Sequence, residues 1–466
     1  MNTSTENEDV ASIIARNFVD TKYNDLPSEV VQAVKKSVLD TLGVTLASST
    51  MVPECRWLAE LVKEEGGKEE STIIGFGGRA PAWMAAFVNG GLVHGLDYDD
   101  THHGSSSHPS GPLMPAAFAI AERVGRISGK DFITAIALGH DMLIRMTYSI
   151  GSRDYLNSFT RFTVLGVFAA AATCGKLMRL TEEKMRNAIA IALCYSAGTH
   201  DTWLGAGSGL RPIIDAFPNK GGVISAIMAD KGITGPRNSL EGERAFFNAY
   251  YQGKYERDIL ISDLGQRFEG TSTGYKPWPS CAGTHSCIDA TLRLVNEHDI
   301  TAGNIEGISL IVSERARHNF EPAEVVRKPE TLTFAQWSLP FTVAVAAAKR
   351  RVVLDDFTPE GIRDEVSLGL AQRVVPRFDP QLSTEGITPC TVEIKMKDGR
   401  KYSMKVDFPY GDSRNPMIME DIIRKFKDCA THSAKPLSQE QIRQVIQMVN
   451  KLEEVDDVSQ IVRPLG

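Results

Sequence analysis

Residues 89–113 read NGGLVHGLDYDDTHHGSSSHPSGPL, and the rest of the chain is organised around this stretch. It holds a dense group of titratable side chains: His94, Asp97, Asp99, Asp100, His102, His103 and His108. The apolar run 85–93 precedes the group and the alanine-rich run 114–124 follows it, and both favour helices. We therefore predict a polar loop between two packed helices, which is a common way to hold catalytic side chains on a rigid scaffold.

The loop contains the residue types that general acid and base catalysis needs. Histidine titrates near neutral pH, and burial can raise the pKa of a carboxylate toward the same range. The residues alone also suggest two other interpretations. Asp-Asp-Thr followed by Gly and Ser is also typical of a helix cap and a solvated turn. His102, His103 and His108 resemble metal ligands, but they lack the i, i+4 spacing of a helical histidine pair and no Cys pair lies nearby, so we predict no metal.

Composition limits the class of protein. The chain has 466 residues, of which 42% are hydrophobic and 23% are charged, as expected for a globular enzyme of two or three domains. Its formal charge of -7 leaves no basic excess for binding nucleic acid. No apolar run reaches membrane-spanning length, and the first residues do not form a signal sequence. Because the cysteines are scattered and form no Cys-x-x-Cys pair, we predict a reduced, cytoplasmic protein without a membrane partner.

Helical spacing of apolar residues dominates the first half of the sequence. Helices are expected over residues 26–46, 54–65, 114–124, 130–146, 165–178, 181–196 and 220–231, and again over 421–426 and 438–452. The small residues in 165–178 and 181–196 allow close helix packing, as in the core of a large bundle. We predict a large all-α helical domain over residues 1–268, completed by residues 412–466.

The pattern changes after residue 268. Pro277 and Pro279 exclude a helix at the centre of 274–285. Residues 305–312 alternate as a strand does, and two further strand patterns, 391–396 and 401–406, flank an Asp-Gly turn that predicts a hairpin. We predict a smaller α+β lid domain over residues 269–411, within a fold that is mainly α.

Several motifs in a fixed order make the chain resemble the MmgE/PrpD family over nearly its whole length. The motifs are Leu26-Pro27, Leu39-Asp40-Thr41-Leu42-Gly43, Asn89-Gly90, His94-x-x-Asp97-Tyr98-Asp99-Asp100-Thr101, His108-Pro109-Ser110, Gly129-Lys130-Asp131, Lys276-x-x-Pro279-x-Cys281-x-x-x-His285, Asp289-Ala290, and the segment with Pro409, Gly411 and Pro416. The family includes 2-methylcitrate dehydratases, cis-aconitate decarboxylases and iminodisuccinate epimerases. The resemblance implies the same two-domain fold, a homodimer, and a metal-independent and cofactor-independent enzyme that transfers a proton next to a carboxylate of a small polycarboxylic acid.

The resemblance also implies roles for particular residues. Lys220 and Lys276 match active-site lysines of the decarboxylase-like members, where they would hold substrate carboxylates and offset the charge of an enolate-like dianion. Asp97 and His108 would exchange the proton, without either being assigned as acid or base. The expected substrate-binding residues are Thr101, His102, His103, Thr160, Arg161 and His285.

The two lysines and His285 also have plainer interpretations. A lone lysine is usually a solvated surface charge, but Lys276 lies in a turn stiffened by proline and Lys220 is expected at a glycine-flanked helix start. His285 is equally well explained as a hydrogen-bonded histidine near a helix start.

One position departs from the family pattern and bears on the reaction. Thr160 stands where decarboxylase-like members carry a histidine, with Arg161 as a neighbouring cation, and the loop from Thr101 to His108 is longer by a residue. These differences favour a dehydratase-like lyase, similar to 2-methylcitrate dehydratase. Epimerase or isomerase chemistry, cis-aconitate decarboxylase-like chemistry and a non-catalytic small-acid binding protein are the alternatives.

Overall fold

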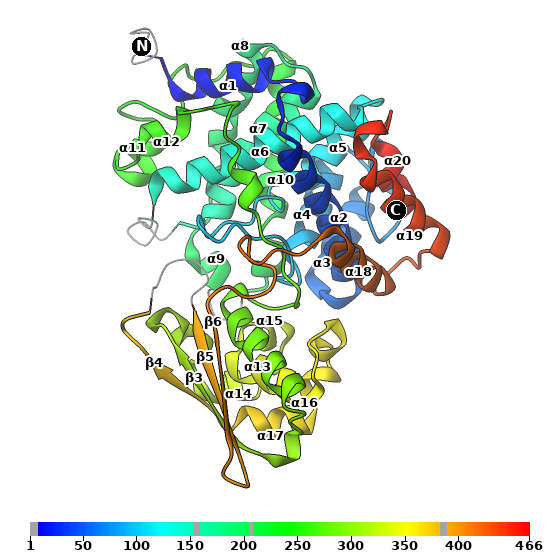
Figure 1. Cartoon of the computed structure of the whole chain (residues 1–466). Coiled ribbons are helices and arrows are strands. Elements are labelled where there is room, and N and C mark those ends of the chain that lie inside the picture. Colours follow the sequence, from blue (N-terminus) through cyan, green and yellow to red (C-terminus); the bar gives the residue numbers. More distant parts are fainter. Residues whose placement is uncertain (1–7, 152–158, 205–207, 383–388) are drawn as a thin grey trace. The chain divides into compact units, whose positions relative to one another are not determined.

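The chain is mainly α-helical, as predicted, with a small mixed sheet in its second half (Figure 1). The computed structural model describes residues 8–151, 159–204, 208–382 and 389–466. Contacts divide the chain into two units. Unit 1 comprises Met1–Gly95, Ser107–Thr273 and Met419–Gly466, and unit 2 comprises Leu96–Ser106 and Gly274–Ile418. The domain limits expected from the sequence stay a prediction.

Unit 1 is built from helices, with one short antiparallel ribbon. Its helices are α1 (Val10–Asp20), α2 (Ser28–Met51), α3 (Pro53–Glu65), α4 (Ala82–His94), α5 (Met114–Val124), α6 (Gly129–Ile150), α7 (Arg161–Leu177), α8 (Glu182–Ala192), α9 (His200–Leu204), α10 (Ala216–Asp230), α11 (Phe246–Tyr251), α12 (Arg257–Ile261), α18 (Met419–Thr431), α19 (Gln439–Asn450) and α20 (Ser459–Val462), and its ribbon pairs β1 (Ser71–Thr72) with β2 (Arg79–Ala80). The helices predicted in this part of the chain are therefore confirmed, with small shifts at their ends. Among the described residues, no helix has both the length and the apolar character needed to cross a bilayer.

Small residues bring the central helices of unit 1 close together. A Cβ atom added to Gly222 of α10 would lie 2.4 Å from the Cβ of Ala170 on α7. A Cβ added to Gly90 of α4 would lie 2.6 Å from Nδ2 of Asn219 on α10. Any side chain at these two glycines would push the helices apart, so their close packing depends on the small residues seen in the sequence.

The predicted start of the helix at Lys220 is wrong. Helix α10 begins at Ala216, and Lys220 lies in its second turn. Pro218 falls in the first turn, where backbone N–H groups have no acceptor within the helix, so proline is tolerated there. The lysine is therefore held by a formed helix rather than by a flexible helix end.

The C-terminal helices pack on α2. Nζ of Lys425 on α18 lies 2.7 Å from Oδ1 of Asp40, and both side chains are buried. A Cβ added to Gly43 would lie 3.2 Å from the Cα of Phe426. The Asp40 and Gly43 positions of the family motif thus serve to seat α18 on α2.

Unit 2 combines a four-stranded sheet with a layer of helices. Its elements are α13 (His285–Glu297), β3 (Ile305–Val312), α14 (Ala323–Arg327), α15 (Leu332–Trp337), α16 (Leu339–Lys349), α17 (Glu365–Ala371), β4 (Val374–Phe378), β5 (Cys390–Met396) and β6 (Lys401–Val406). The strand order is β4-β3-β5-β6, with β4 parallel to β3 and the other pairs antiparallel. The predicted strands 305–312, 391–396 and 401–406 are confirmed, including the hairpin.

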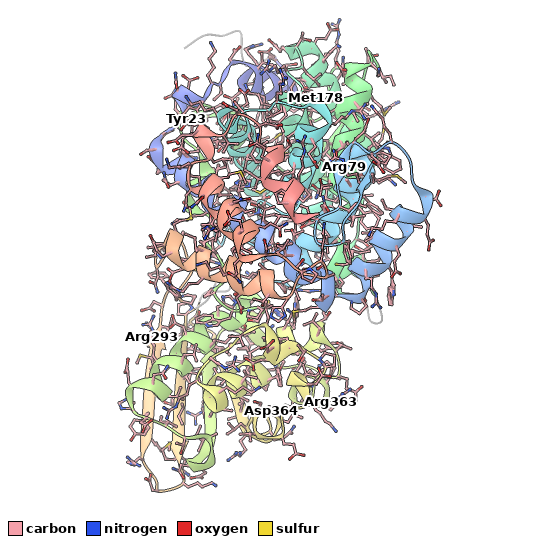
Figure 2. The ribbon with its side chains drawn as sticks, turned by 90° about the vertical axis from the view of Figure 1, so that its right-hand side faces the viewer. Tyr23, Arg79, Met178, Arg293, Arg363 and Asp364 are labelled. Atoms are coloured by element: carbon pink, nitrogen blue, oxygen red, sulfur yellow. The ribbon has the colours of Figure 1, made fainter. Side chains whose placement is uncertain are left out.

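The helices of unit 2 cover one face of this sheet (Figure 1). Leu294 of α13 and Val343 of α16 share one apolar core with Leu310 of β3 and Val392 of β5. The opposite side of α13 faces water, where exposed Arg293 pairs with Asp289 one turn earlier (Figure 2). Helix α13 is therefore amphipathic, with one side in the core and the other exposed.

Sequence reasoning missed strand β4. Its sequence, Val-Val-Pro-Arg-Phe, contains Pro376, which argues against a strand because proline cannot donate to the ladder. The structure places β4 at an edge of the sheet, where only β3 is a partner and one side of the strand needs no ladder donors.

Candidate active site

The Lys276 ammonium and the Asp97 carboxylate form a buried pair in unit 2. Nζ of Lys276 donates to Oδ1 of Asp97 at 2.5 Å and to the backbone oxygen of the same residue at 2.7 Å. Asp99 adds a second carboxylate, with Oδ1 at 3.8 Å from the ammonium. Burial lowers the pKa of Lys276, but attraction to Asp97 and Asp99 outweighs it and the pKa is raised. Lys276 is therefore a fixed cation at neutral pH.

Asp97 is held from several sides. Its backbone adopts a φ of 47°, in the left-handed region that aspartate tolerates better than most residues. Oδ2 accepts a hydrogen bond of 3.0 Å from Nε1 of Trp337, the last residue of α15. The neighbouring Gln336 donates from Nε2 to the backbone oxygens of Leu96 and Pro279. The carboxylate is thereby oriented by a lysine and an indole from distant parts of the sequence.

The turn that carries Lys276 is shaped by glycines and prolines. Gly274 and Thr101 exchange two backbone hydrogen bonds, of 2.9 and 2.8 Å, and so join the loop to the turn. Gly411 adopts a φ of 91°, and a Cβ there would lie 2.1 Å from the backbone oxygen of Tyr275. Only glycine permits this approach. The predicted absence of a helix at the centre of 274–285 is confirmed, and a 3₁₀ turn, Ala282–Thr284, leads into α13.

Thr101 has a buried hydroxyl with no hydrogen-bond partner among the described residues. A buried hydroxyl is normally paired, because leaving it unpaired costs about 1–3 kcal/mol. A carboxylate or hydroxyl of a bound substrate would supply this partner if Thr101 binds substrate, as the sequence predicts.

His285 lies at the start of α13 and is neutral at physiological pH. Burial lowers its pKa to about 3, and repulsion from Lys276 adds to the shift. Nε2 lies 3.2 Å from the backbone oxygen of Ser280, which can only accept, so Nε2 carries the proton. The ring contacts Trp278 edge to face, with centroids 5.2 Å apart.

His102 and His103 are buried beside the same turn. Burial lowers the pKa of His102 to about 4 and also lowers the pKa of His103. Nδ1 of His102 accepts from the backbone N–H of Ser105 at 3.2 Å. Nδ1 of His103 lies 3.2 Å from Oδ2 of Asp412, a carboxylate that Arg414 also binds through two 2.8 Å hydrogen bonds. Burial raises the pKa of Asp412, but these cationic and polar partners outweigh it and hold the pKa below its usual range.

These neutral histidines predict that acid weakens the fold. The pKa values of His102 and His285 are about 4 and about 3 in the folded chain, below the ordinary 6.5. Between each of these folded-state values and pH 6.5, the unfolded chain therefore binds more protons than the folded chain. The contribution of these histidines to stability is complete above about pH 6.5 and falls as the pH decreases, by up to about 1.4 kcal/mol per pH unit for each histidine. Urea unfolding at pH 7, 6 and 5 measures this slope. His285→Gln should make the slope shallower, and an unchanged slope in that variant would contradict the assignment.

In unit 1, His108 packs against His94 at the end of α4. Their rings meet edge to face with centroids 4.9 Å apart. Two residues further on, Oγ of Ser110 lies 3.1 Å from Nε2 of His140 on α6. Asn219 of α10 fixes the end of the loop, because its Nδ2 donates to the backbone oxygen of Gly111 and its Oδ1 accepts from the N–H of Ala116.

Lys220 differs from Lys276 in its surroundings. It is half-buried, and Nζ lies 5.1 Å from the ring centroid of Trp83 and 5.0 Å from that of Phe87. It makes no hydrogen bond or ion pair with another residue that the structure describes. Among the described residues, the ammonium therefore rests against two aromatic faces.

Thr160 and Arg161 open helix α7. The Thr160 hydroxyl is buried and lies 2.6 Å from the hydroxyl of Thr163. A guanidinium nitrogen of Arg161 donates to the backbone oxygen of Gly151 at 3.0 Å. Their substrate-binding roles stay predictions.

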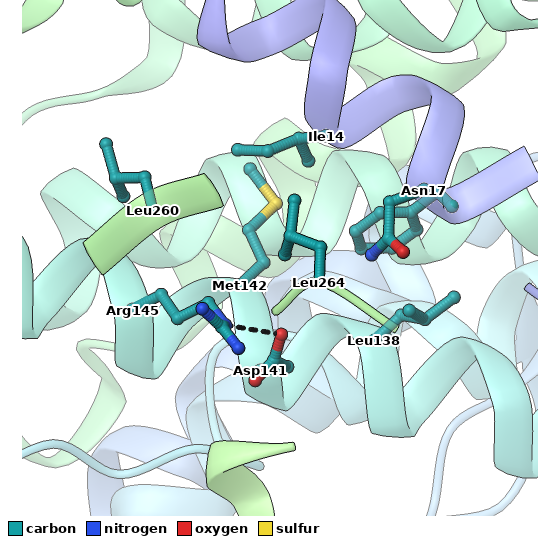
Figure 3. A pocket seen from close by; sticks show the side chains of 9 residues that line it. Ile14, Asn17, Leu138, Asp141, Met142, Arg145, Leu260 and Leu264 are labelled. Carbon is teal, nitrogen blue, oxygen red and sulfur yellow. Dashed lines mark hydrogen bonds and ion pairs between the residues drawn. The ribbon is translucent and has the colours of Figure 1, made fainter. Parts of the chain in front are cut away.

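A cavity of about 10 Å³ lies elsewhere in unit 1, around Asp141 and Arg145 (Figure 3). It has room for about one water molecule and is too small for a polycarboxylic acid. Arg145 donates to Asp141 and to three backbone oxygens, those of Ile259, Ser262 and Arg267. This buried ion pair secures the segment around α12.

Several residues of the candidate site escaped sequence reasoning. They are Trp337, Gln336, Asp412 and Arg414 in unit 2 and Trp83, Phe87 and Asn219 in unit 1. The sequence around an isolated tryptophan or aspartate does not predict which distant residue its side chain contacts. The family motif with Gly411 lies next to Asp412 and was the one clue available.

Two family models match the chain. Residues 12–258 match the MmgE/PrpD N-terminal domain, and residues 278–451 match the MmgE/PrpD C-terminal domain. Cis-aconitate decarboxylase of Homo sapiens is 26% identical in an alignment of 448 positions that covers 94% of this chain and 90% of that protein. The Mus musculus cis-aconitate decarboxylase is 26% identical over 461 aligned positions, covering 95% of this chain and 91% of that protein. A cis-aconitate decarboxylase-like protein of Aspergillus oryzae is 25% identical over 480 aligned positions, covering 98% of this chain and 97% of that protein. Because both domain models match in order and the first alone spans more than half of the sequence, the chain belongs to the MmgE/PrpD family.

Proposed function

We propose that the chain is a cofactor-independent lyase that transfers a proton next to a carboxylate of a small polycarboxylic acid. The observation that carries this proposal is the contrast between its two lysines: Lys276 is paired with Asp97, whereas Lys220 has no carboxylate partner among the described residues. The relatives support it, because they are cis-aconitate decarboxylases and decarboxylation is a lyase reaction.

Lys220 is proposed to bind a substrate carboxylate. A half-buried ammonium that has no carboxylate partner among the described residues gains most from an external anion, whose binding displaces none of the described carboxylates. Removal of a proton next to a carboxylate creates an enolate-like dianion, and a fixed cation stabilises this charge as it develops. Lys220 therefore has the properties of a cation that binds the substrate and stabilises its negative charge.

Lys276 is proposed to act mainly through Asp97. Because its ammonium donates twice to Asp97, the aspartate is fixed in place and Lys276 supplies positive charge beside it. Proton exchange is assigned to Asp97 and His108, as the family resemblance implies. His102 and His285, with pKa values of about 4 and about 3, are weak bases and are proposed to bind substrate as neutral hydrogen-bonding groups.

Replacing Trp337 tests the orientation of Asp97. Trp337→Phe keeps an aromatic ring but removes the N–H that donates to Oδ2 of Asp97. A hydrogen bond to a charged group contributes about 1.5–3 kcal/mol, so we expect kcat/KM to fall about tenfold to hundredfold. Trp57→Phe is the matched control, because Trp57 is 56% exposed on α3. Equal kcat/KM values for the two variants would contradict this role of Trp337.

The specific reaction is proposed to be dehydration of a 2-methylcitrate-like acid. Base-catalysed loss of the carbon-bound proton gives the dianion, and an acid then protonates the hydroxyl that leaves as water. Thr160, in place of the histidine of decarboxylase-like members, supports this choice. The names of the relatives favour a second candidate, decarboxylation, in which CO₂ departs and the acid protonates the carbanion. Epimerisation would return the proton to the opposite face of the carbon.

Turnover of a panel of acids tests the proposal. The purified chain is incubated with 2-methylcitrate, cis-aconitate and iminodisuccinate, and products are identified by proton NMR. An unsaturated product that retains all carbons supports dehydration, whereas loss of a carboxyl group supports the second candidate. If no acid is consumed, the lyase proposal fails and a small-acid binding protein becomes the better account. The homodimer, the cytoplasmic location and the lid role of unit 2 stay predictions.

A further inference from the structure

Helix α4 presents two aromatic rings to the ammonium of Lys220. Trp83 and Phe87 are one helical turn apart and therefore share a face of α4. Nζ of Lys220 lies within cation–π distance of both centroids, at 5.1 and 5.0 Å. All three side chains are half-buried. The two rings form an aromatic platform under the ammonium.

The packing of α4 on α10 fixes the platform. Gly90, three residues after Phe87, allows the backbone of α4 to approach α10 at Asn219, the residue before Lys220. Phe217 of α10 contacts Phe87 edge to face, with centroids 5.6 Å apart and an interplanar angle of 74°. The distance between the rings and the lysine is therefore set by helix packing, which varies little, rather than by a loop.

Several other buried or half-buried lysines in the described part of the chain have oxygen partners. Lys276, Lys425, Lys35 and Lys349 each pair with a carboxylate, and Lys176 donates to two backbone oxygens. A carboxylate partner would compete with a bound acid for the ammonium. Aromatic faces attract a cation more weakly and accept no conventional hydrogen bond from it, so they hold Lys220 in place without competing.

We propose that Trp83 and Phe87 are positioning residues that hold Lys220 ready for a substrate carboxylate. This inference rests on the proposed function, since it assumes that Lys220 binds the acid. The platform orders the long lysine side chain before substrate arrives, which reduces the entropy lost on binding. It also excludes water from one side of the ammonium and so strengthens its attraction to an anion. The platform thus contributes to substrate binding more than to the chemical step.

NMR of the methylated enzyme tests the geometry without relying on activity. Reductive ¹³C-methylation labels the lysines while keeping their charge, and Lys220→Arg identifies the Lys220 signal. Ring currents from Trp83 and Phe87 should shift this signal away from those of exposed lysines. In Trp83→Leu the signal should move back toward them, in Trp83→Phe it should stay closer to that of the unaltered chain, and in the control Trp57→Leu it should not move. An unmoved signal in Trp83→Leu would overturn the proposal.

Kinetics of the unmethylated enzyme test the consequence. We expect KM for the turned-over acid to rise about three- to thirtyfold in Trp83→Leu, with kcat changed much less and with partial rescue in Trp83→Phe. An unchanged KM would overturn the positioning role even if the NMR signal moves. So would a constant KM with a loss in kcat as large as the expected rise in KM. If the unaltered chain turns over no acid, the proposed function fails and the positioning role fails with it, while the NMR signal still reports the platform itself.

Discussion

Lys276→Met is expected to lower the free energy of unfolding by about 3–5 kcal/mol and to reduce kcat/KM at least a thousandfold. The substitution keeps the volume and apolar stem of the lysine but leaves the buried carboxylates of Asp97 and Asp99 without their cation. An uncompensated buried charge is among the most destabilising changes a protein can suffer. Urea unfolding measures the loss of stability, and product NMR measures the loss of turnover.

A second variant separates the two effects of Lys276→Met. In the double variant Asp97→Asn with Lys276→Met, the cation and one carboxylate are removed together, so part of the lost stability should return. Activity should not return, because both groups are proposed to serve the reaction. Recovered activity in the double variant would show that the pair is only structural. Full stability in the single variant would mean that the pair contributes little to the fold.

Lys220→Met is expected to reduce kcat/KM about a hundredfold to a thousandfold while changing the free energy of unfolding by less than about 0.5 kcal/mol. Lys220 has no ion-pair partner among the described residues, so its removal leaves none of their buried carboxylates without a cation. Lys220 is proposed to interact with the substrate carboxylate alone. The two lysines should therefore differ sharply: one variant loses activity and stability, and the other loses activity only.

Lys231→Met is the matched control for Lys220→Met. Lys231 follows the last residue of α10 and is exposed. Its replacement should leave both activity and stability near those of the unaltered chain. Equal activities for Lys220→Met and Lys231→Met would rule out a substrate-binding role for Lys220, and a large loss of stability in Lys220→Met would show that the lysine supports the fold.

Most helices and the hairpin could be predicted from the sequence because their signals are local. Apolar residues repeat at helical spacing in 26–46, and an Asp-Gly turn separates the strands β5 and β6. Strand β4 was missed since its one stabilising partner, β3, lies far away in the chain and Pro376 opposes a strand locally. The start of α10 was misplaced because Pro218 looks like a helix breaker unless the helix has already been located.

The candidate site was predictable only where a motif gathers residues in one stretch. Asp97 and the histidines around it stand together in the sequence, and Lys276 stands out in its proline-rich turn. That Lys276 would be paired with Asp97, rather than open to solvent, depends on the bridge between Thr101 and Gly274, which no local pattern encodes. Trp337 reaches Asp97 from the end of α15 through tertiary packing alone. Sequence thus indicated the chemistry of the site, and the structure supplied its partners.

Solvent deuterium incorporation is the most direct test of proton transfer next to a carboxylate. The purified chain, freed of metals by a chelator, is incubated in deuterium oxide with the panel of di- and tricarboxylic acids and followed by proton NMR. We predict that deuterium appears at a carbon adjacent to a carboxylate in one acid or its product, and that Asp97→Asn slows this exchange strongly. Absence of exchange with every acid, or exchange that Asp97→Asn leaves intact, would contradict the account.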